Sequence, residues 1–377
     1  MAYSAIGRLF RCQTPSVRQT INSFTQKRCF SGREVPTFKP TKSPELDQTL
    51  HRFRDEVFIP NSLSEHQRLW IYRPRHAHKL NEHPITVTIG EDEQYRLRPI
   101  DKRTLPTQQD VINVLTLMHK TENWSNLPTF LAGLRRASMR LKRSRWQWLV
   151  RKAGEANGLG TLVECARQAT RTGFLLKDAG LVKRLFFQLH LLGQQKSFTG
   201  KALTVLEHHE KHNLPVKYPT PLAQANGYAK QLTLAMEAPE HFVHDFSIAP
   251  YAQPGVIGVL LELKAAQALE TGGEASQEAH ELVPRLLESW KHRDLNINGK
   301  NWYDLDKMLQ EYVPIYNGMK LALQLDVVAS DKPLYSKLKT AADGLGKVIG
   351  SIKKKTPKDI QEKPSIGLNQ AQLLHED

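Results

Sequence analysis

A dense group of basic residues offers the most specific chemistry in this sequence. Residues 134–152 read LRRASMRLKRSRWQWLVRK and contain eight Lys or Arg, two Trp and no acid; the nearest carboxylates are those of Glu122 and Glu155. Like charges at helical spacing repel by roughly 0.2–0.5 kcal/mol per pair, so an anionic partner or acids from elsewhere in the fold must relieve them. The candidate RNA-binding residues are Arg135, Arg136, Arg140, Lys142, Arg143, Arg145, Trp146, Arg151 and Lys152.

If Arg136, Arg140 and Arg143 lie on one helical face, they step at i, i+4 and i+7 and extend over roughly 10 Å of its axis. That spacing can follow the phosphates of a nucleic acid, because the guanidinium group binds phosphate through two hydrogen bonds and stacks on bases. Trp146 is then a candidate stacking group at the surface. The alternative is a solvated basic helix that acids from the rest of the fold neutralise. Further basic residues could extend the surface: Arg167, Arg171, Lys177, Lys183, Arg184 and, as a weaker second contact, Lys353–Lys355.

Catalytic motifs do not accompany these residues. The sequence contains no GxxxxGK[ST], no GxGxxG after a strand, no GxSxG, no HExxH and no CxxC. Cys165 is predicted to be a small buried hydrophobe rather than a nucleophile. Two histidine groups would each need a further, distant ligand to hold a metal: His208, His209 and His212, and His241 and His244. We therefore predict a protein that is not an enzyme and needs no cofactor and no metal.

The first 30 residues have the composition of a mitochondrial transit peptide. They contain four Arg, one Lys, six Ser or Thr and no acid, with apolar residues that can form a stripe beside the arginines. We predict import into the mitochondrial matrix and cleavage near Phe30 and Ser31; a basic disordered arm is the alternative. Cleavage would remove five positive charges, lowering the net charge from +15 to +10. It would also leave Cys165 as the single cysteine, which excludes an intramolecular disulfide.

Hydrophobic periodicity predicts a mainly α-helical chain with one small β-hairpin near the N-terminus. The hairpin is predicted from Ile85–Ile89 and Tyr95–Ile100, where apolar and β-branched residues alternate around a polar turn. Helical periodicity dominates from residue 107 onwards, and no apolar run approaches the roughly 18 residues that cross a bilayer. The predicted regions are a flexible linker (31–48), short helices with the hairpin (49–106), a basic helical-repeat region (107–240), a C-terminal helical region (241–352) and a disordered basic tail (353–377).

Helices between residues 142 and 236 come in pairs with short connections. The segment TLVECARQATRTGFLLKD (161–178) shares its pattern with KALTVLEHHEKHNLPVKY (201–218), at an offset of 40 residues. This pairing resembles the pentatricopeptide-type repeat and implies a helical-hairpin repeat or a solenoid-like bundle. The offset is longer than is usual in that family and residues that would read bases are not evident, so a base-by-base RNA code is not implied. A generic α-helical bundle is the alternative.

A basic, helical matrix protein with an Arg-rich segment fits RNA-rich machinery. We predict a non-catalytic component of mitochondrial translation, in particular a mitochondrial ribosomal subunit that contacts rRNA and ribosomal proteins. Two alternatives remain: a helical scaffold that assembles a respiratory complex, with its basic surface on an acidic client or on lipid headgroups, and a translational activator that binds a mitochondrial mRNA. RNA recovered after cross-linking would favour the first prediction over the scaffold.

Overall fold

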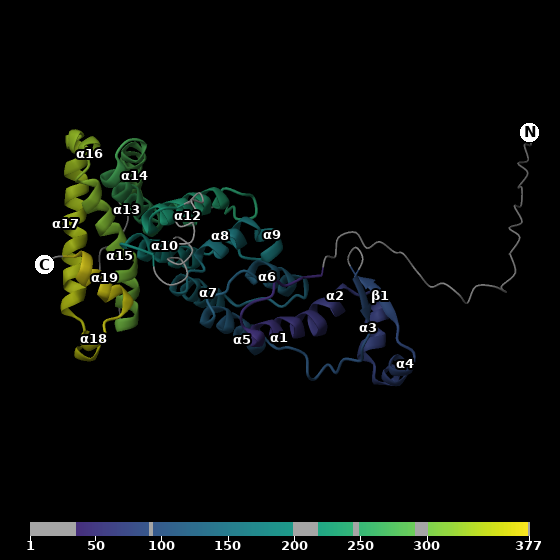
Figure 1. The fold of residues 1–377 in the computed structure, drawn as a ribbon. Coiled ribbons are helices and arrows are strands. Elements are labelled where there is room, and N and C mark those ends of the chain that lie inside the picture. The colour runs from purple at the N-terminus through teal and green to yellow at the C-terminus, as the bar shows by residue number, and fades with distance from the viewer. Residues whose placement is uncertain (1–34, 90–92, 199–217, 244–248, 291–300, 376–377) are drawn as a thin grey trace, which may run out of the picture.

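The computed structural model describes residues 35–89, 93–198, 218–243, 249–290 and 301–375. The predicted transit peptide, the second copy of the repeat pattern and the histidines at 208, 209, 212 and 244 lie outside the described residues. The described chain is mainly α-helical, with one two-stranded antiparallel sheet, as predicted (Figure 1).

The N-terminal part combines short helices with the hairpin. Strands β1 and β2 pair in an antiparallel register that sets Thr86 opposite Arg96. The second strand ends earlier than predicted because Pro99 lacks an N–H group to continue the ladder. A small core of Leu63, Ile71, Leu80 and Leu97 holds this module together. Its elements are α1 (Pro44–Phe53), η1 (Arg54–Phe58), α2 (Ile59–Ser62), α3 (Glu65–Tyr72), η2 (Pro74–His76), α4 (Ala77–Glu82), β1 (Thr86–Ile89) and β2 (Glu93–Arg96).

The predicted flexible linker is shorter than expected. Helix α1 begins at Pro44, where Ser43 accepts a hydrogen bond from the Leu46 N–H and so caps the first turn. Ahead of it, the ring of Phe38 lies against Phe58 and Phe130, and the Lys39 amide donates to Asn126 Oδ1 at 2.9 Å. These contacts fix residues 38–43 against the core, so the prediction of a flexible segment is wrong for them.

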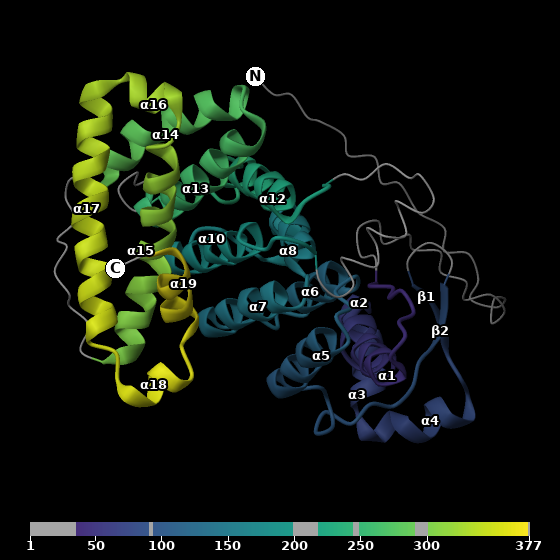
Figure 2. The same ribbon diagram turned by 60° about the vertical axis from the view of Figure 1, so that its left-hand side comes forward.

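Paired helices form two adjoining layers in the centre of the molecule. Helices α5, α7 and α10 contact one another in turn, and α6, α8 and α12 do so beside them (Figure 2). The apolar faces of both layers meet in one large core that includes Phe130, Leu162 and Phe186. The helices are α5 (Gln108–Lys120), α6 (Leu127–Arg136), α7 (Arg143–Glu155), α8 (Leu159–Arg167), α9 (Ala169–Thr172), α10 (Ala179–Gly193) and α12 (Pro221–Met236).

The C-terminal bundle includes a tail that was predicted to be disordered. Residues 358–362 and 366–374 are helical instead, and α19 packs on α15, where Leu368 and Ala371 are buried. The few apolar residues of this segment are buried only by contact with the folded bundle. Its Lys-rich composition alone therefore predicted disorder incorrectly. The elements are η3 (Pro250–Ala252), α13 (Pro254–Thr271), α14 (Glu274–Trp290), α15 (Trp302–Ala322), α16 (Asp326–Ser330), α17 (Lys332–Lys354), α18 (Lys358–Glu362) and α19 (Ile366–Leu374).

Helix α13 joins the central layers to this bundle. Val259 and Leu263 belong to the central core, whereas Leu261 and Ala265 belong to the C-terminal core. A helix that is apolar all round must be buried, and α13 has both cores as neighbours. Gly318 of α15 permits the closest approach, because a Cβ there would lie 2.8 Å from the backbone oxygen of Gly258 in α13.

One polar cluster is buried at this junction. The carboxylate of Glu262 in α13 lies 2.6 Å from His190 Nδ1 of α10, and it accepts hydrogen bonds from Gln194 at 2.7 Å and from Asn317 of α15 at 2.5 Å. His190 and Glu262 are 0% and 1% exposed. Buried charge is tolerated only where hydrogen bonds replace water, and here these bonds join three helices.

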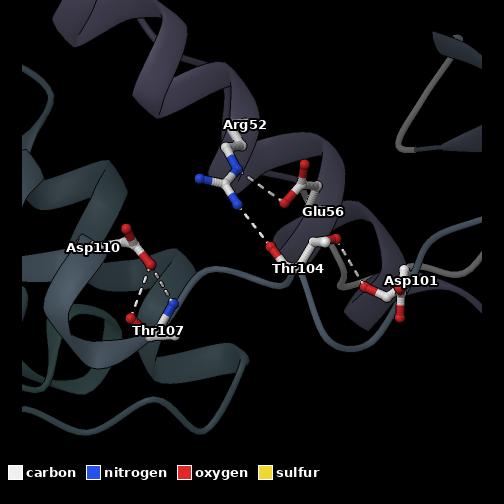
Figure 3. A network of polar contacts seen from close by, with 6 residues as sticks. All are labelled: Arg52, Glu56, Asp101, Thr104, Thr107 and Asp110. Carbon is white, nitrogen blue, oxygen red and sulfur yellow. Dashed lines mark hydrogen bonds and ion pairs between the residues drawn. The ribbon is translucent and has the colours of Figure 1, made fainter.

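A polar network fixes the connection between the hairpin module and α5 (Figure 3). Arg52 of α1 bonds Glu56 through Nε at 3.1 Å, and its Nη2 donates to the backbone oxygen of Thr104 at 2.6 Å. At the start of α5 the Thr107 amide donates to Asp110 Oδ2 at 2.7 Å, which lowers the pKa of that carboxyl. Because the folded-state pKa lies below the unfolded one, this stabilisation is present above about pH 4 and is lost as the pH falls through the lowered pKa.

The cap of α5 gives a first prediction. Thr107→Ala should lower the free energy of unfolding by about 1 kcal/mol, because the Thr107 hydroxyl accepts from the Gln109 N–H and bonds Asp110 at 2.8 Å. Urea unfolding measures this change. Thr116→Ala, inside the same helix, is the matched control and should change the stability by less than half as much. Equal effects of the two replacements would contradict the capping role.

Candidate nucleic-acid interface

The basic stretch 134–152 is broken into two helices. Helix α6 ends at Arg136, where Ser138 takes a positive φ of 58° and the Met139 N–H bonds back to the Leu134 oxygen at 2.9 Å. This geometry ends a helix. Helix α7 starts at Arg143, after extended backbone at Lys142. The prediction that Arg136, Arg140 and Arg143 share one helical face is therefore wrong, because the turn between the helices separates them.

Acids and carbonyl groups of the fold satisfy part of the positive charge. Arg143 forms an ion pair with Asp178, the residue that caps α10. Arg151 and Lys152 both approach Glu155, at 3.8 Å and 2.6 Å. For Arg143, Arg151 and Lys152 the structure therefore agrees with the alternative in which acids from the rest of the fold neutralise the basic stretch.

Arg135 and Arg136 lie in the last turn of α6, where positive charge is favourable beside the helix C-terminus. Arg135 donates to the Ala169 oxygen at 2.8 Å. With Thr170 and Arg171 of α9, the two arginines line an open hollow of about 410 Å³. Three guanidinium groups around one hollow can surround a phosphate.

Three cations in the following turn remain exposed. Within the described part of the chain, no ion pair or hydrogen bond reaches the side chains of Arg140, Lys142 or Arg145. Lys142 and Arg145 lie at the N-terminus of α7, which has no side-chain cap and no acid in its first turn. Cations are unfavourable at that positive end of the helix dipole, whereas a bound anion would be stabilised by the dipole and by both side chains. We call Arg136, Arg140, Lys142 and Arg145, with the adjoining hollow, the basic edge.

Trp146 is not the surface stacking group that was predicted. It is half-buried and packs on the central core, with its ring 5.3 Å from that of Phe174 and inclined by 48°. Because α7 starts afresh at Arg143, its rotation differs from that of a continuous helix and turns Trp146 inward. Trp146 therefore positions α7 and does not offer an open face to a base.

The remaining candidates for chemistry have structural roles. Cys165 is fully buried, and burial raises the pKa of its thiol, so it is an unreactive core residue as predicted. His241 is also buried: its Nδ1 accepts from the Leu176 N–H at 2.9 Å, while Nε2 lies 2.9 Å from the Ala166 oxygen. Both ring nitrogens of His241 are thus occupied. No cluster of His, Cys, Asp and Glu suited to a metal occurs among the residues that the structure describes.

The bridging His241 gives a second prediction. His241→Ala should lower the free energy of unfolding by about 2–4 kcal/mol, because it leaves a buried N–H and a buried carbonyl group without partners and opens a cavity. Thermal unfolding followed by circular dichroism measures this change. His78→Ala is the control, because His78 is 81% exposed and contacts only Glu82 on the surface. A His241 variant as stable as the His78 variant would contradict the bridging role.

Comparison with known proteins assigns this chain to a family. Residues 22–207 and 219–373 match the family described as Mrp13, mitochondrial ribosomal protein mS27. The chain belongs to the mitochondrial ribosomal protein mS27 family. A relative from Neurospora crassa, the small ribosomal subunit protein mS27, is 29% identical over 183 residues. That alignment covers 46% of this chain and 46% of the relative, so it spans about half the length of the relative.

Family membership agrees with the function class predicted from the sequence. The family is described as one of mitochondrial ribosomal proteins, which confirms the predicted matrix location. None of the helices within the described residues is both long enough and apolar enough to cross a membrane. The match spans the whole basic edge.

This mS27-family chain has a second basic surface, at residues 66–81, that was not predicted from the sequence. Residues 66–81 contain four Lys or Arg, three His and no acid. The ring of Trp70 stacks on His76 at 4.6 Å, and Lys102 lies over the ring of Tyr72 at 5.4 Å. Burial and the charges of Arg75, Lys79, Arg73 and His66 lower the pKa of His76. The absence of acids between residues 66 and 81 could have indicated this surface, but the turn from α3 into η2 was needed to bring the rings of Trp70 and His76 together.

Proposed function

We propose that this chain is a non-catalytic structural component of the small subunit of the mitochondrial ribosome and that its basic edge contacts rRNA. The observation that carries the proposal is the exposed group Arg140, Lys142 and Arg145 at an uncapped helix N-terminus, without an acid to neutralise it among the described residues. The family assignment and the relative's name support the ribosomal context.

Recognition would be directed at the phosphate backbone rather than at base edges. The guanidinium groups of Arg136, Arg140 and Arg145 and the ammonium group of Lys142 would replace counterions on successive phosphates, and Arg135 and Arg171 would extend the contact into the hollow. The inward position of Trp146 leaves this edge without a stacking ring of its own. The second basic surface at residues 66–81 would add a separate contact.

We also infer that the paired helices are a divergent pentatricopeptide-type stack. Two features support this inference: α5, α7 and α10 form one layer, and α6, α8 and α12 form the other. In such stacks one layer lines a concave surface and the other covers it. The layers would then present grooves to neighbouring ribosomal proteins, while the basic edge meets RNA.

Sedimentation of lysed mitochondria tests the proposal. A C-terminally tagged chain should migrate with the small ribosomal subunit in a sucrose gradient at low and at moderate salt, together with its rRNA. High salt should release it if backbone contacts dominate, because polyelectrolyte contacts weaken steeply with ionic strength. Migration as a small free species at every salt concentration, or with a respiratory complex, would overturn the ribosomal proposal and favour an assembly scaffold.

A further inference from the structure

A cationic cavity lies where the central layers meet the C-terminal bundle. It has a volume of about 310 Å³, near the lower limit of roughly 300 Å³ for pockets that hold small molecules. Helices α7, α10, α13 and α15 each contribute to its walls, and Figure 2 shows the end of α10 against α15. Its charged and polar lining consists of Arg143, Gln147, Lys183, Arg184, Lys307, Gln310 and Glu311.

Positive charge predominates in this lining. Four cations face one acid, and that acid, Glu311, already pairs with Lys183 at 3.0 Å. Arg143 pairs with Asp178, so Arg184 and Lys307 are the two lining cations without an ion pair among the described residues; Lys307 lies 4.1 Å from the centre of the Tyr303 ring. Asp306 lies near Arg184, but its carboxylate is occupied by Ser365, by the Gly367 amide at 3.0 Å and by Gln310 at 2.6 Å.

Arg184 is the key residue of the cavity. Its side chain is half-buried, and no ion pair or hydrogen bond reaches it from the described part of the chain. Burial, together with the charge of Arg151, lowers the pKa of this guanidinium group. The charge of Asp306 acts in the opposite sense but forms no direct ion pair with Arg184. A half-buried charge without a direct ion pair is costly, and an anion in the cavity would relieve that cost.

The N-terminus of α13 adds to the preference of this cavity for an anion. Gly180 and Gly255 line the cavity within the first turns of α10 and α13. The Gly180 N–H already donates to the capping Asp178, whereas α13 has no side-chain cap, so of these two helices it is α13 that directs a free positive dipole end towards the cavity. Gly255 carries no Cβ, and the side chain of Glu311 lies against it. Phe187 and Val259 provide an apolar wall beside the charges.

We propose that this cavity binds a phosphate group, carried either by a mononucleotide or by an RNA backbone. Arg184 and Lys307 would hold the phosphate oxygens, the first turn of α13 would face them, and the apolar wall would accommodate the attached nucleoside. The cavity is separate from the basic edge, so this inference does not depend on the proposed rRNA contact there.

Thermal unfolding of the purified full chain, with pyrophosphate, with AMP or with a short single-stranded RNA, tests this site. Pyrophosphate or AMP should raise the melting temperature in a concentration-dependent way, because a ligand that binds only the folded state stabilises it. The variant R184Q/K307Q should lose that shift. The control K337Q/K339Q removes two exposed lysines of α17 and should keep it.

A second variant separates binding from folding. Gln147→Glu adds a carboxylate among the cations of the cavity, so it should abolish the ligand-induced shift while the chain itself stays at least as stable as before. A shift with pyrophosphate or AMP that Q147E abolishes supports a mononucleotide as the source of the phosphate. A shift with RNA alone that Q147E abolishes supports the RNA backbone. No shift with any ligand, or equal shifts in Q147E and the parent chain, overturns the proposal.

The basic edge can be tested apart from the cavity. A chain with Arg140, Lys142 and Arg145 replaced by Gln should keep the AMP or pyrophosphate shift if the cavity binds phosphate. Loss of the shift in that variant, but not in Q147E, would overturn the cavity proposal and leave the proposed function intact.

Discussion

Glu262→Ala should lower the free energy of unfolding by about 3–5 kcal/mol, the largest loss that we expect from a single replacement in this chain. The Glu262 carboxylate is 1% exposed and accepts from Gln194 and Asn317 while it meets His190, so its removal leaves two buried polar groups, His190 and Asn317, without their partner. The replacement also loosens the joint of α10, α13 and α15. Urea unfolding, followed by the circular dichroism of the helices, measures the loss.

The control for this prediction lies on the same helix. Glu270 of α13 is exposed, and Glu270→Ala should change the stability by less than about 0.5 kcal/mol. A double-mutant cycle with His190→Ala isolates the pair, since groups in one network are not additive. If Glu262→Ala and Glu270→Ala prove equally mild, the cluster does not hold the two cores together.

Reversal of charge at the basic edge should abolish association with the ribosome. In the variant R140E/K142E/R145E, three cations that can meet phosphates become anions that repel them. Because these side chains have no ion pair with the described residues, the fold should survive the change. The log–log slope of RNA affinity against salt concentration, measured on the purified chain, should become shallower by about one for each phosphate that the variant no longer neutralises.

A matched reversal elsewhere separates this effect from a change in net charge. Lys337, Lys339 and Lys347 are exposed on α17, at the far end of the molecule from the hairpin module (Figure 1). The variant K337E/K339E/K347E carries the same net charge and should still sediment with the small subunit. If both triple variants detach, or if neither does, the basic edge has no specific part in assembly.

Hydrophobic periodicity in the sequence was sufficient to predict the positions of most of the helices. The pattern around Leu181, Leu185, Leu189 and Leu192 predicted a helix over 179–193, and α10 has those bounds. The spacing of apolar residues shows which face of a helix must be buried. This face is the same whichever element the helix packs against. The same pattern separates a helix over 127–139 from one over 142–156, and the structure has this break, with α6 ending at Arg136 and Ser138 at a positive φ.

The sequence did not show which distant segments pack against one another. The tail at 353–377 looked disordered because its own apolar residues are few, but α15 supplies the surface that orders them. His241 looked like a metal candidate, yet its two partners, Leu176 and Ala166, are 65 and 75 residues away in the chain. Hydrogen bonds of that sequence separation exist only after the helices have packed.

The sequence by itself determined the basic and mainly helical character of the chain, the presence of one hairpin and the class of function, because charge and hydrophobic period are properties of local residue order. Only the tertiary structure decided which cations are free to bind. It paired Arg143 with Asp178, turned Trp146 into the core, and left Arg140, Lys142 and Arg145 exposed. The physical reason is that the state of a charge depends on which distant groups the fold brings within a few ångströms of it.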